Sequence, residues 1–256
     1  MLKNVFVASS ALACVFAAST ASAGDLFNLD PAPSGVYAAV YGGRPFLNDS
    51  AFSGVSTPEA GVPGPTGAAG VPLNADLELS GDFTVGAALG YQLPFRYFSI
   101  FHPRLEVEVS YLEQNVEGGS FNGGAQIFGG EQEQTFVFFN NYSDIIFSEN
   151  QRFTPYVGGG IGVAFVDSNA VYFPPTAAGP TFGIVGEDSA LAGHFAVGGP
   201  FDVSDNVEFY TEGRYFRIQN VDLERRFIGG GADLLSGAVE DDIEGFTATA
   251  GLRYRF

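Results

Sequence analysis

The chain has 256 residues and a formal net charge of −18, with 29 acidic residues against 11 basic ones. This balance excludes the basic surface that nucleic-acid binding requires, and a hydrophobic content of 46% excludes an acidic disordered tail. At this length we expect one large domain.

The first 23 residues are typical of a secretory signal peptide. Lys3 precedes an apolar run over 5–18, and the small-residue sequence ASA follows at 21–23. The run is too short for a membrane-spanning helix, which needs roughly 18 apolar residues or more. We therefore expect cleavage after residue 23 and a single mature domain over 24–256. A lipoprotein signal that uses Cys14, the only cysteine, is the alternative, and the exported domain itself contains no cysteine for a disulfide.

Eight segments of the mature domain are predicted to be β-strands. Their apolar and polar residues alternate with the two-residue period of a strand that has one apolar face. In chain order these segments are 35–43, 82–93, 104–113, 134–147, 154–166, 190–201, 206–216 and 246–256. Each has about the 9–11 residues that a tilted strand needs to cross a bilayer. The facing of 134–147 stays unassigned, because aromatic residues occupy both parities there.

The connections between these segments alternate in length. Long ones (44–81, 114–133, 167–189 and 217–245) alternate with short ones (94–103, 148–153 and 202–205). Outer-membrane barrels have this arrangement, with short periplasmic turns and long external loops. Within the third long connection, 170–173 and 181–186 are predicted to pair as a hairpin that extends two strands. The alternative is that they add a ninth and a tenth strand.

Alternation alone does not separate a membrane barrel from a soluble sandwich or barrel. We favour the membrane barrel because the chain is exported and because a closed barrel leaves no unpaired strand edge in lipid. Six tyrosines near strand ends are expected to form an interfacial belt: Tyr37, Tyr41, Tyr91, Tyr111, Tyr215 and Tyr254. Small residues such as Gly86, Gly158 and Gly251 fall on the polar face, where strands would curve around a narrow interior.

Four stretches of the sequence then point to a family. The terminal GLRYRF resembles the C-terminal signature of Gram-negative outer-membrane proteins. PYVGGGIGVAF, LSGDFTVGAALGYQL with RLEVEVSY, and SDNVEFYTEGRYF resemble strands of small eight-stranded barrels of the porin family, such as the OmpA transmembrane domain and the OmpX-like and Opa-like proteins. The chain departs from this pattern in having no Trp, so any aromatic girdle consists of Tyr and Phe.

The resemblance implies an all-β transmembrane antiparallel up-and-down barrel in the cell outer membrane, most simply with eight strands. It also implies that Leu252, Tyr254 and Phe256 face lipid and form the signal read by the barrel assembly machinery. Outer-membrane lipid and lipopolysaccharide are the other expected partners. A surface ligand would bind through the four long connections.

Seven charged residues are predicted to point into the lumen: Arg104, Glu106, Glu108, Glu208, Glu212, Arg214 and Arg253. A charge inside a narrow barrel must be paired or hydrated, since isolating it costs several kcal/mol. Arg214 and Arg253 are the expected partners of the carboxylates Glu106 and Glu212. Because an eight-stranded barrel is only wide enough for side chains, we expect a polar plug, with a gated pore as the alternative.

No catalytic, cofactor or metal site is predicted. His102 is expected in a periplasmic turn, and His194 is expected to point inward without a serine partner. The acidic run 240–244 is more typical of a solvated loop than of a cation site that bridges lipopolysaccharide phosphates. The sequence therefore favours a structural or surface-interaction role through acidic external loops. A narrow porin and a lipid A-modifying enzyme are the alternatives.

Overall fold

The fold is known from a computed structural model, which describes residues 29–47, 49–58, 68–148 and 151–256. The predicted signal peptide lies outside these residues. Within them, no helix is long and apolar enough to cross a membrane. The secondary structure is β-strand apart from the 3-10 turn η1 at Gly229–Gly231.

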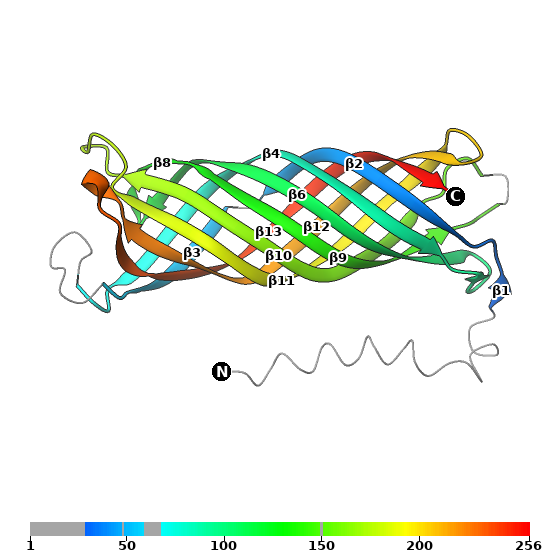
Figure 1. The fold of residues 1–256 in the computed structure, drawn as a ribbon, viewed down its shortest axis with the longest axis horizontal. Helices are drawn as coiled ribbons and strands as arrows, with labels where there is room; N and C mark the ends of the chain where they lie inside the picture. The colour runs from blue at the N-terminus through cyan, green and yellow to red at the C-terminus, as the bar shows by residue number, and fades with distance from the viewer. Residues whose placement is uncertain (1–28, 48, 59–67, 149–150) are drawn as a thin grey trace.

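Eight long strands form a closed antiparallel barrel (Figure 1). They are β2 (Gly35–Leu47), β4 (Pro72–Gln92), β6 (Phe101–Phe121), β9 (Glu131–Ile145), β10 (Tyr156–Phe173), β11 (Phe182–Asp202), β12 (Val207–Phe227) and β13 (Leu234–Arg255). Each pairs with the next in this order. The ring closes because β13 pairs with β2, with Gly245 opposite Leu47 and Arg255 opposite Tyr37.

Five short strands lie at the two ends of the barrel, and two of them, β1 and β5, form a separate small sheet. β1 (Asp30–Pro31) pairs with β5 (Phe95–Arg96) at the end of the barrel near the C-terminus, whereas β7 (Gly124–Ala125) pairs with β6 at the opposite end. β3 (Ser50–Ser56) follows β2 and pairs with both β4 and β13. β8 (Ile127–Gly129) precedes β9 and pairs with the end of β10. β3 and β8 therefore lengthen the wall of the barrel without adding strands to the ring.

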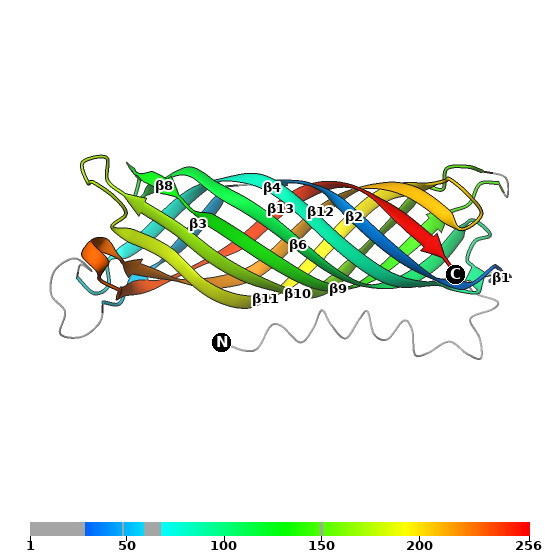
Figure 2. The same ribbon diagram turned by 45° about the horizontal axis from the view of Figure 1, so that its top comes forward.

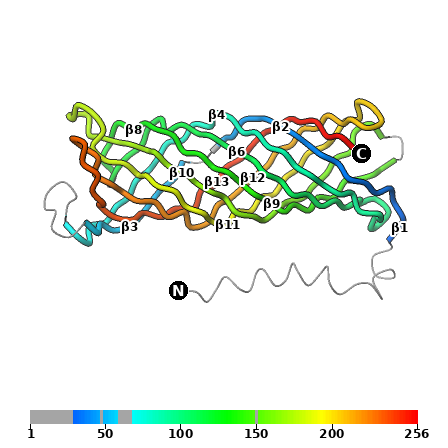
Figure 3. Tube along the Cα trace, in the orientation of Figure 1, coloured from blue at the N-terminus to red at the C-terminus, as the bar shows by residue number. Residues whose placement is uncertain are grey.

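The eight predicted strands are all present, and most are longer than predicted. In Figures 2 and 3 they continue well beyond the middle of the barrel at the end far from the C-terminus. The predicted hairpin is confirmed, with Val171 opposite Gly183 and Tyr172 opposite Phe182, both as extensions of β10 and β11. The expectation of long loops is wrong for most of 114–133, 167–189 and 217–245, which belong to strands.

The barrel has two halves with opposite polarity. In the half next to the C-terminus, here the proximal half, the outward side chains are apolar and the inward ones are polar. Every one of the eight strands exposes a large apolar side chain there: Val40, Leu89, Val107, Phe139, Ile161, Phe195, Phe209 and Leu252. These side chains form an apolar belt around the barrel.

In the distal half the polarity is reversed. Acidic side chains point outward from the strands, among them Asp76, Glu117, Glu131, Asp167, Asp222 and Glu240. Inside lies a continuous apolar core that includes Phe52, Leu77, Phe136, Tyr172, Ile184, Ile218 and Ile243. Outside this core, Arg217 Nη2 donates to Asp242 Oδ2 at 2.5 Å, which lowers the pKa of the Asp242 carboxyl. Burial raises the pKa of neighbouring Asp241.

Shifts in strand register accompany this change of polarity. They occur between Gly81 and Phe83 on β4 and between Ile218 and Val221 on β12. A shift of one residue exchanges the faces of all later residues in a strand. Beyond such a shift, residues of the other parity point inward. The apolar side chains of β4 and β12 can therefore face the core of the distal half.

Candidate functional site: a charge network in the lumen

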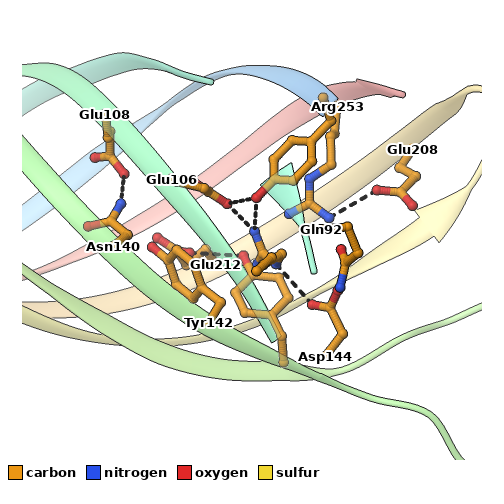
Figure 4. A network of polar contacts seen from close by, with 12 residues as sticks. Gln92, Glu106, Glu108, Asn140, Tyr142, Asp144, Glu208, Glu212 and Arg253 are labelled. Atoms are coloured by element: carbon orange, nitrogen blue, oxygen red, sulfur yellow. Dashed lines mark hydrogen bonds and ion pairs between the residues drawn. The ribbon is translucent and has the colours of Figure 1, made fainter. Parts of the chain in front are cut away.

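The lumen of the proximal half contains all seven charged residues predicted for it. Each is buried, between 1% exposed for Arg104 and 8% for Glu212. Arg104, Glu106 and Glu108 come from β6, Glu208, Glu212 and Arg214 from β12, and Arg253 from β13. Those of one strand point the same way because alternate residues of a strand share a face. Figure 4 labels Glu106, Glu108, Glu208, Glu212 and Arg253, together with Gln92 of β4 and Asn140, Tyr142 and Asp144 of β9.

The first cluster surrounds Arg104. Its Nη1 contacts Glu106, and its Nε donates to Asp144 Oδ1 at 3.0 Å. Tyr37 donates from its hydroxyl to Glu106 Oε1 at 2.6 Å. The Arg104 guanidinium also lies 4.3 Å from the ring centre of Tyr142, a cation–π contact that offsets part of its desolvation.

The second cluster surrounds Arg214. It binds Glu108 through two parallel hydrogen bonds, Nη1 to Oε1 at 2.5 Å and Nη2 to Oε2 at 2.9 Å, the bidentate geometry that suits a guanidinium and a carboxylate. Its Nε donates to Glu212 Oε1 at 3.0 Å. Tyr41 and Asn140 donate to the two remaining acceptor positions of Glu108, at 2.6 and 2.8 Å. Glu108 therefore receives four hydrogen bonds.

The third cluster lies nearest the C-terminal rim. Arg253 Nη1 donates to Glu208 Oε2 at 3.0 Å, and Arg255 Nη1 lies 3.2 Å from the other oxygen of that carboxylate. Figure 4 shows Glu208 beside Arg253, from directly opposite positions on the adjacent strands β12 and β13. Tyr156 donates from its hydroxyl to Glu212 Oε2 at 2.9 Å. The three clusters together form what we term the lumen network: the seven predicted residues with Asp144, Asn140 and the hydroxyls of Tyr37, Tyr41 and Tyr156.

The expected pairing within this network is partly wrong. Glu106 contacts Arg104 on its own strand rather than Arg214 or Arg253, while Glu212 does pair with Arg214. Sequence reasoning missed Asp144 and Asn140, because both lie on the strand whose facing was unassigned. Tyr37 and Tyr41 were expected in the outer aromatic belt but point inward to Glu106 and Glu108. Their parity with Ala39, which is buried, was the available signal.

Inward aromatic side chains of the network lie over glycines on the neighbouring strand. Five such pairs are directly opposite in register: Tyr37–Gly90, Tyr41–Gly86, Tyr142–Gly158, Tyr156–Gly198 and Tyr210–Gly251. A Cβ atom at Gly251 would lie 2.7 Å from the Tyr210 ring, closer than van der Waals contact allows. The glycines thus provide the space in which the tyrosines fold flat inside a narrow barrel.

Side chains occupy most of the lumen, and two small cavities lie between them. A cavity of about 10 Å³ lies within the lumen network, roughly the space of one water molecule. A second cavity, of about 20 Å³, lies between the network and the apolar core, beside Leu112, Phe136 and Phe216. Within the described residues no group of three or more His, Cys, Asp and Glu side chains is arranged to hold a metal ion.

The two histidines are placed close to where they were expected. His102 is the second residue of β6 rather than part of the turn before it, and its Nε2 lies 2.8 Å from the Leu93 carbonyl oxygen. His194 points inward and its Nε2 lies 2.8 Å from Asn140 Oδ1. It packs edge-on against Phe138, with ring centres 4.7 Å apart. Neither histidine contacts a serine hydroxyl in these hydrogen bonds.

The residues of the C-terminal signature lie on the outer face. Leu252, Tyr254 and Phe256 are 51%, 48% and 75% exposed, whereas Arg253 between them is buried. The Tyr254 and Phe256 rings contact each other edge to face, with centres 5.2 Å apart. These side chains continue the apolar belt to the rim next to the chain end.

A closed β-barrel with an apolar belt outside and charges inside has the reverse of the polarity of a soluble barrel, and this polarity suits a bilayer. The chain has the fold of an outer-membrane β-barrel. The proximal half has the polarity that suits lipid, and the short turns and both ends of the barrel lie at its rim.

Comparisons with known proteins find similarity in structure but none in sequence. No protein-family model matches the chain, and no curated protein matches it. Among solved structures it is similar to the outer membrane protease OmpT of Escherichia coli, at 13% identity and a TM-score of 0.48, over 89% of this chain and 98% of that one. It is also similar to OprG of Pseudomonas aeruginosa, at 14% identity and a TM-score of 0.43, over 87% of this chain and 96% of that one. A third similar structure is Neisserial surface protein A, at 13% identity and a TM-score of 0.42, over 88% of this chain and 100% of that one.

Proposed function

We propose that this protein is a non-enzymatic surface protein whose external half binds a partner with a basic surface. The observation that carries the proposal is the distribution of polar groups. Ion pairs occupy the lumen of the proximal half, and apolar side chains occupy that of the distal half. The interior of the barrel therefore offers little room for a ligand or a solute. The outward face of the distal half is what remains accessible from outside the cell.

That accessible face is strongly acidic. Glu133, Asp167 and Glu187 lie directly opposite one another on three adjacent strands, and Glu113 continues the row on β6. Like charges in direct cross-strand register destabilise a sheet, so the row is not explained by stability. A partner with clustered Lys or Arg side chains would be attracted to it and would relieve the repulsion.

The binding part of the proposal is tested with cells that display the wild-type protein or a variant. We expect attachment to a surface coated with a basic protein to fall for Glu133→Gln/Asp167→Asn at physiological salt. The matched control, Asp202→Asn/Asp205→Asn, removes the same number of charges at the periplasmic rim and should attach normally. Equal attachment of wild type and the external variant would refute the proposal.

The closed lumen gives a separate test against the porin alternative. Purified protein inserted into planar bilayers is expected to give no discrete conductance steps, because each cavity of the lumen holds about one water molecule. Regular steps of one size would favour the porin. For the alternative of a lipid A-modifying enzyme, labelled lipid A incubated with refolded protein should remain unchanged.

A further inference from the structure

One inward arginine in the distal half differs from those of the lumen network. Arg225 lies two residues from the end of β12, near the opening of the lumen that we term the distal mouth, and it is 6% exposed. The buried arginines Arg104, Arg214 and Arg253 each pair with at least one carboxylate. No carboxylate in the described part of the chain forms an ion pair with Arg225. Its charge is therefore not neutralised by any residue that the structure describes.

The hydrogen-bond partners of Arg225 are neutral. Its Nε donates to the Tyr172 hydroxyl at 2.6 Å, and its Nη1 contacts the Ser236 hydroxyl. Its Nη2 donates to none of the described residues. A guanidinium has five N–H donors, so the edge formed by Nη1 and Nη2 keeps donors free. Guanidinium groups bind carboxylates through two such parallel N–H donors.

Aromatic rings hold this guanidinium in a flat slot. Phe121 of β6 and Phe182 of β11 have ring centres 4.4 and 3.8 Å from the guanidinium carbon. The same two rings stack on Tyr172, with centres 5.2 and 5.7 Å away and interplanar angles of 24° and 20°. Tyr172 and Arg225, which are hydrogen-bonded to each other, are therefore flanked by the same pair of phenyl rings. A group that reaches the free edge of the guanidinium lies beside these rings.

Stability alone does not explain this arrangement. Cation–π contacts offset part of the cost of burying a guanidinium, but a buried charge without a counter-ion still costs several kcal/mol. Acidic residues are abundant in the chain, and in the lumen network they neutralise the buried arginines. At position 236, which contacts the guanidinium, the chain has Ser instead. Arg225 thus keeps a positive charge that an anion from outside the barrel can neutralise.

We propose that Arg225 is the recognition residue of a binding site for a planar carboxylate, such as an aromatic acid, at the distal mouth. The carboxylate accepts hydrogen bonds from Nη1 and Nη2, and the apolar body of the ligand lies against Phe121 and Phe182. A carboxylate can lie in the plane of the guanidinium, whereas a tetrahedral phosphate projects oxygens out of that plane toward the rings. The site goes beyond the proposed binding of a basic partner, because it takes an anion and lies inside the mouth.

The test is ligand-observed saturation-transfer NMR with the whole mature protein refolded in detergent micelles, and empty micelles give the background. The probe is benzoate, and benzamide is its neutral counterpart of nearly the same shape. We expect the wild type to bind benzoate about tenfold more tightly than benzamide, as expected for one charged hydrogen-bonded contact. Equal binding of the two probes, or binding of neither, would mean that Arg225 does not recognise a carboxylate, and the proposal would fail.

A third probe identifies the kind of anion. Phenylphosphonate carries the same ring with a tetrahedral head, and it should bind about tenfold more weakly than benzoate, because only a planar head fits between the two rings. Equal or tighter binding of phenylphosphonate would mean that the site takes phosphate-like anions and that the assignment to a carboxylate is wrong.

Two consecutive arginines provide matched variants. Arg225→Gln removes the inward charge and should weaken benzoate binding about tenfold. Arg226→Gln removes the charge of the next residue, which pairs with Glu224 and Asp233, and should bind benzoate as the wild type does. Equal losses in the two variants would overturn the proposal. The comparison of benzoate with benzamide uses only the wild type, so it decides the question even if Arg225→Gln does not fold.

Discussion

At the scale of single residues, the lumen is organised by complementary size and charge. Glycines on one strand leave space for tyrosines on the next, and the tyrosine hydroxyls then donate to carboxylates that also bind arginines. A substitution in a glycine–tyrosine pair therefore also affects the ion pairs, and a substitution in an ion pair affects the tyrosines. Two predictions follow from this coupling.

Gly90→Ala is expected to destabilise the barrel by about 1–3 kcal/mol, the usual range for overpacking. The new methyl group would collide with the Tyr37 ring directly opposite and separate its hydroxyl from Glu106. Urea unfolding in detergent micelles measures the change. Gly193→Ala is the control, since a Cβ there would meet only a carbonyl oxygen, at 3.7 Å. Equal stability of the two variants would contradict this account.

Glu108→Ala is expected to lower the free energy of unfolding by about 3–5 kcal/mol, because Arg214 would lose its bidentate partner in a buried site. In the double variant Glu108→Leu/Arg214→Met the loss should be smaller than the sum of the losses in Glu108→Leu and Arg214→Met. The same urea titration gives the values for the wild type, these two single variants and the double variant. Glu240→Ala, on the exposed outer face, serves as control and should change stability by roughly 0.5 kcal/mol or less. Additive losses would mean that the pair is not coupled.

At the scale of elements, the same strand has two environments. On β6, Val107 is outward and exposed in the belt, whereas Glu117 is outward and exposed in the distal half. The alternation is continuous along the strand, but the polarity of each face reverses. The medium around the strand, lipid or water, is what differs.

Val107→Arg is therefore expected to cost about 2–4 kcal/mol, the range for an arginine facing lipid near the bilayer midplane. Asn115→Arg, at an exposed outward position farther toward the distal end of β6, should cost little stability, because water surrounds this position. Unfolding in lipid bilayers rather than in short-chain detergent resolves this difference. If both substitutions cost the same, the belt does not end between these two positions.

The terminal strand supports a prediction about assembly. Phe256→Ala should leave protease-sensitive chains in the periplasm of cells yet refold in micelles with near-normal β content. One rim residue contributes only about 1.5–3 kcal/mol of burial, whereas recognition by the assembly machinery depends on the free end. A soluble domain fused after Phe256 should have the same effect. Normal surface display of both proteins would refute the role of Phe256 in recognition.

The sequence could predict the proximal half of each strand better than the distal half. In the proximal half the alternation is uninterrupted, as in 104–113, and both faces were assigned correctly. In the distal half, register shifts near Gly81 and Ile218 interrupt the alternation, and the acidic residues with Gly and Pro resemble a loop. Asp144 was missed for another reason: Phe136 to Phe139 place aromatic residues on both faces, one facing the apolar core and one facing lipid.

At the scale of the whole molecule, the barrel combines a membrane protein and a soluble one end to end. The distal half buries an apolar core that the proximal half lacks. Packed strands resist proteases, since cleavage requires local opening of the backbone. The long connections inferred from sequence should therefore behave as folded structure in cells.

Trypsin added to intact cells is expected to leave Arg217, Arg225 and Arg226 uncut, because all three lie within β12. A nonspecific protease should cut in the turn 174–181, which joins β10 to β11 and is not strand. Peptide mapping identifies the sites, and protein unfolded in urea shows that trypsin can cut after each arginine. Rapid cleavage after Arg217 in folded protein would mean that the distal half is not packed as described.

The length of the strands also determines how far the protein reaches. β13 has 22 residues, and at about 3.3 Å per residue with a tilt of roughly 40° it spans on the order of 55 Å along the barrel axis. The hydrocarbon belt of such barrels is about 25 Å tall, so the outermost turns stand on the order of 25 Å above the lipid. A large soluble protein can therefore touch these turns without contacting the lipid surface, and the rigid walls hold the contact at a fixed distance from the bilayer.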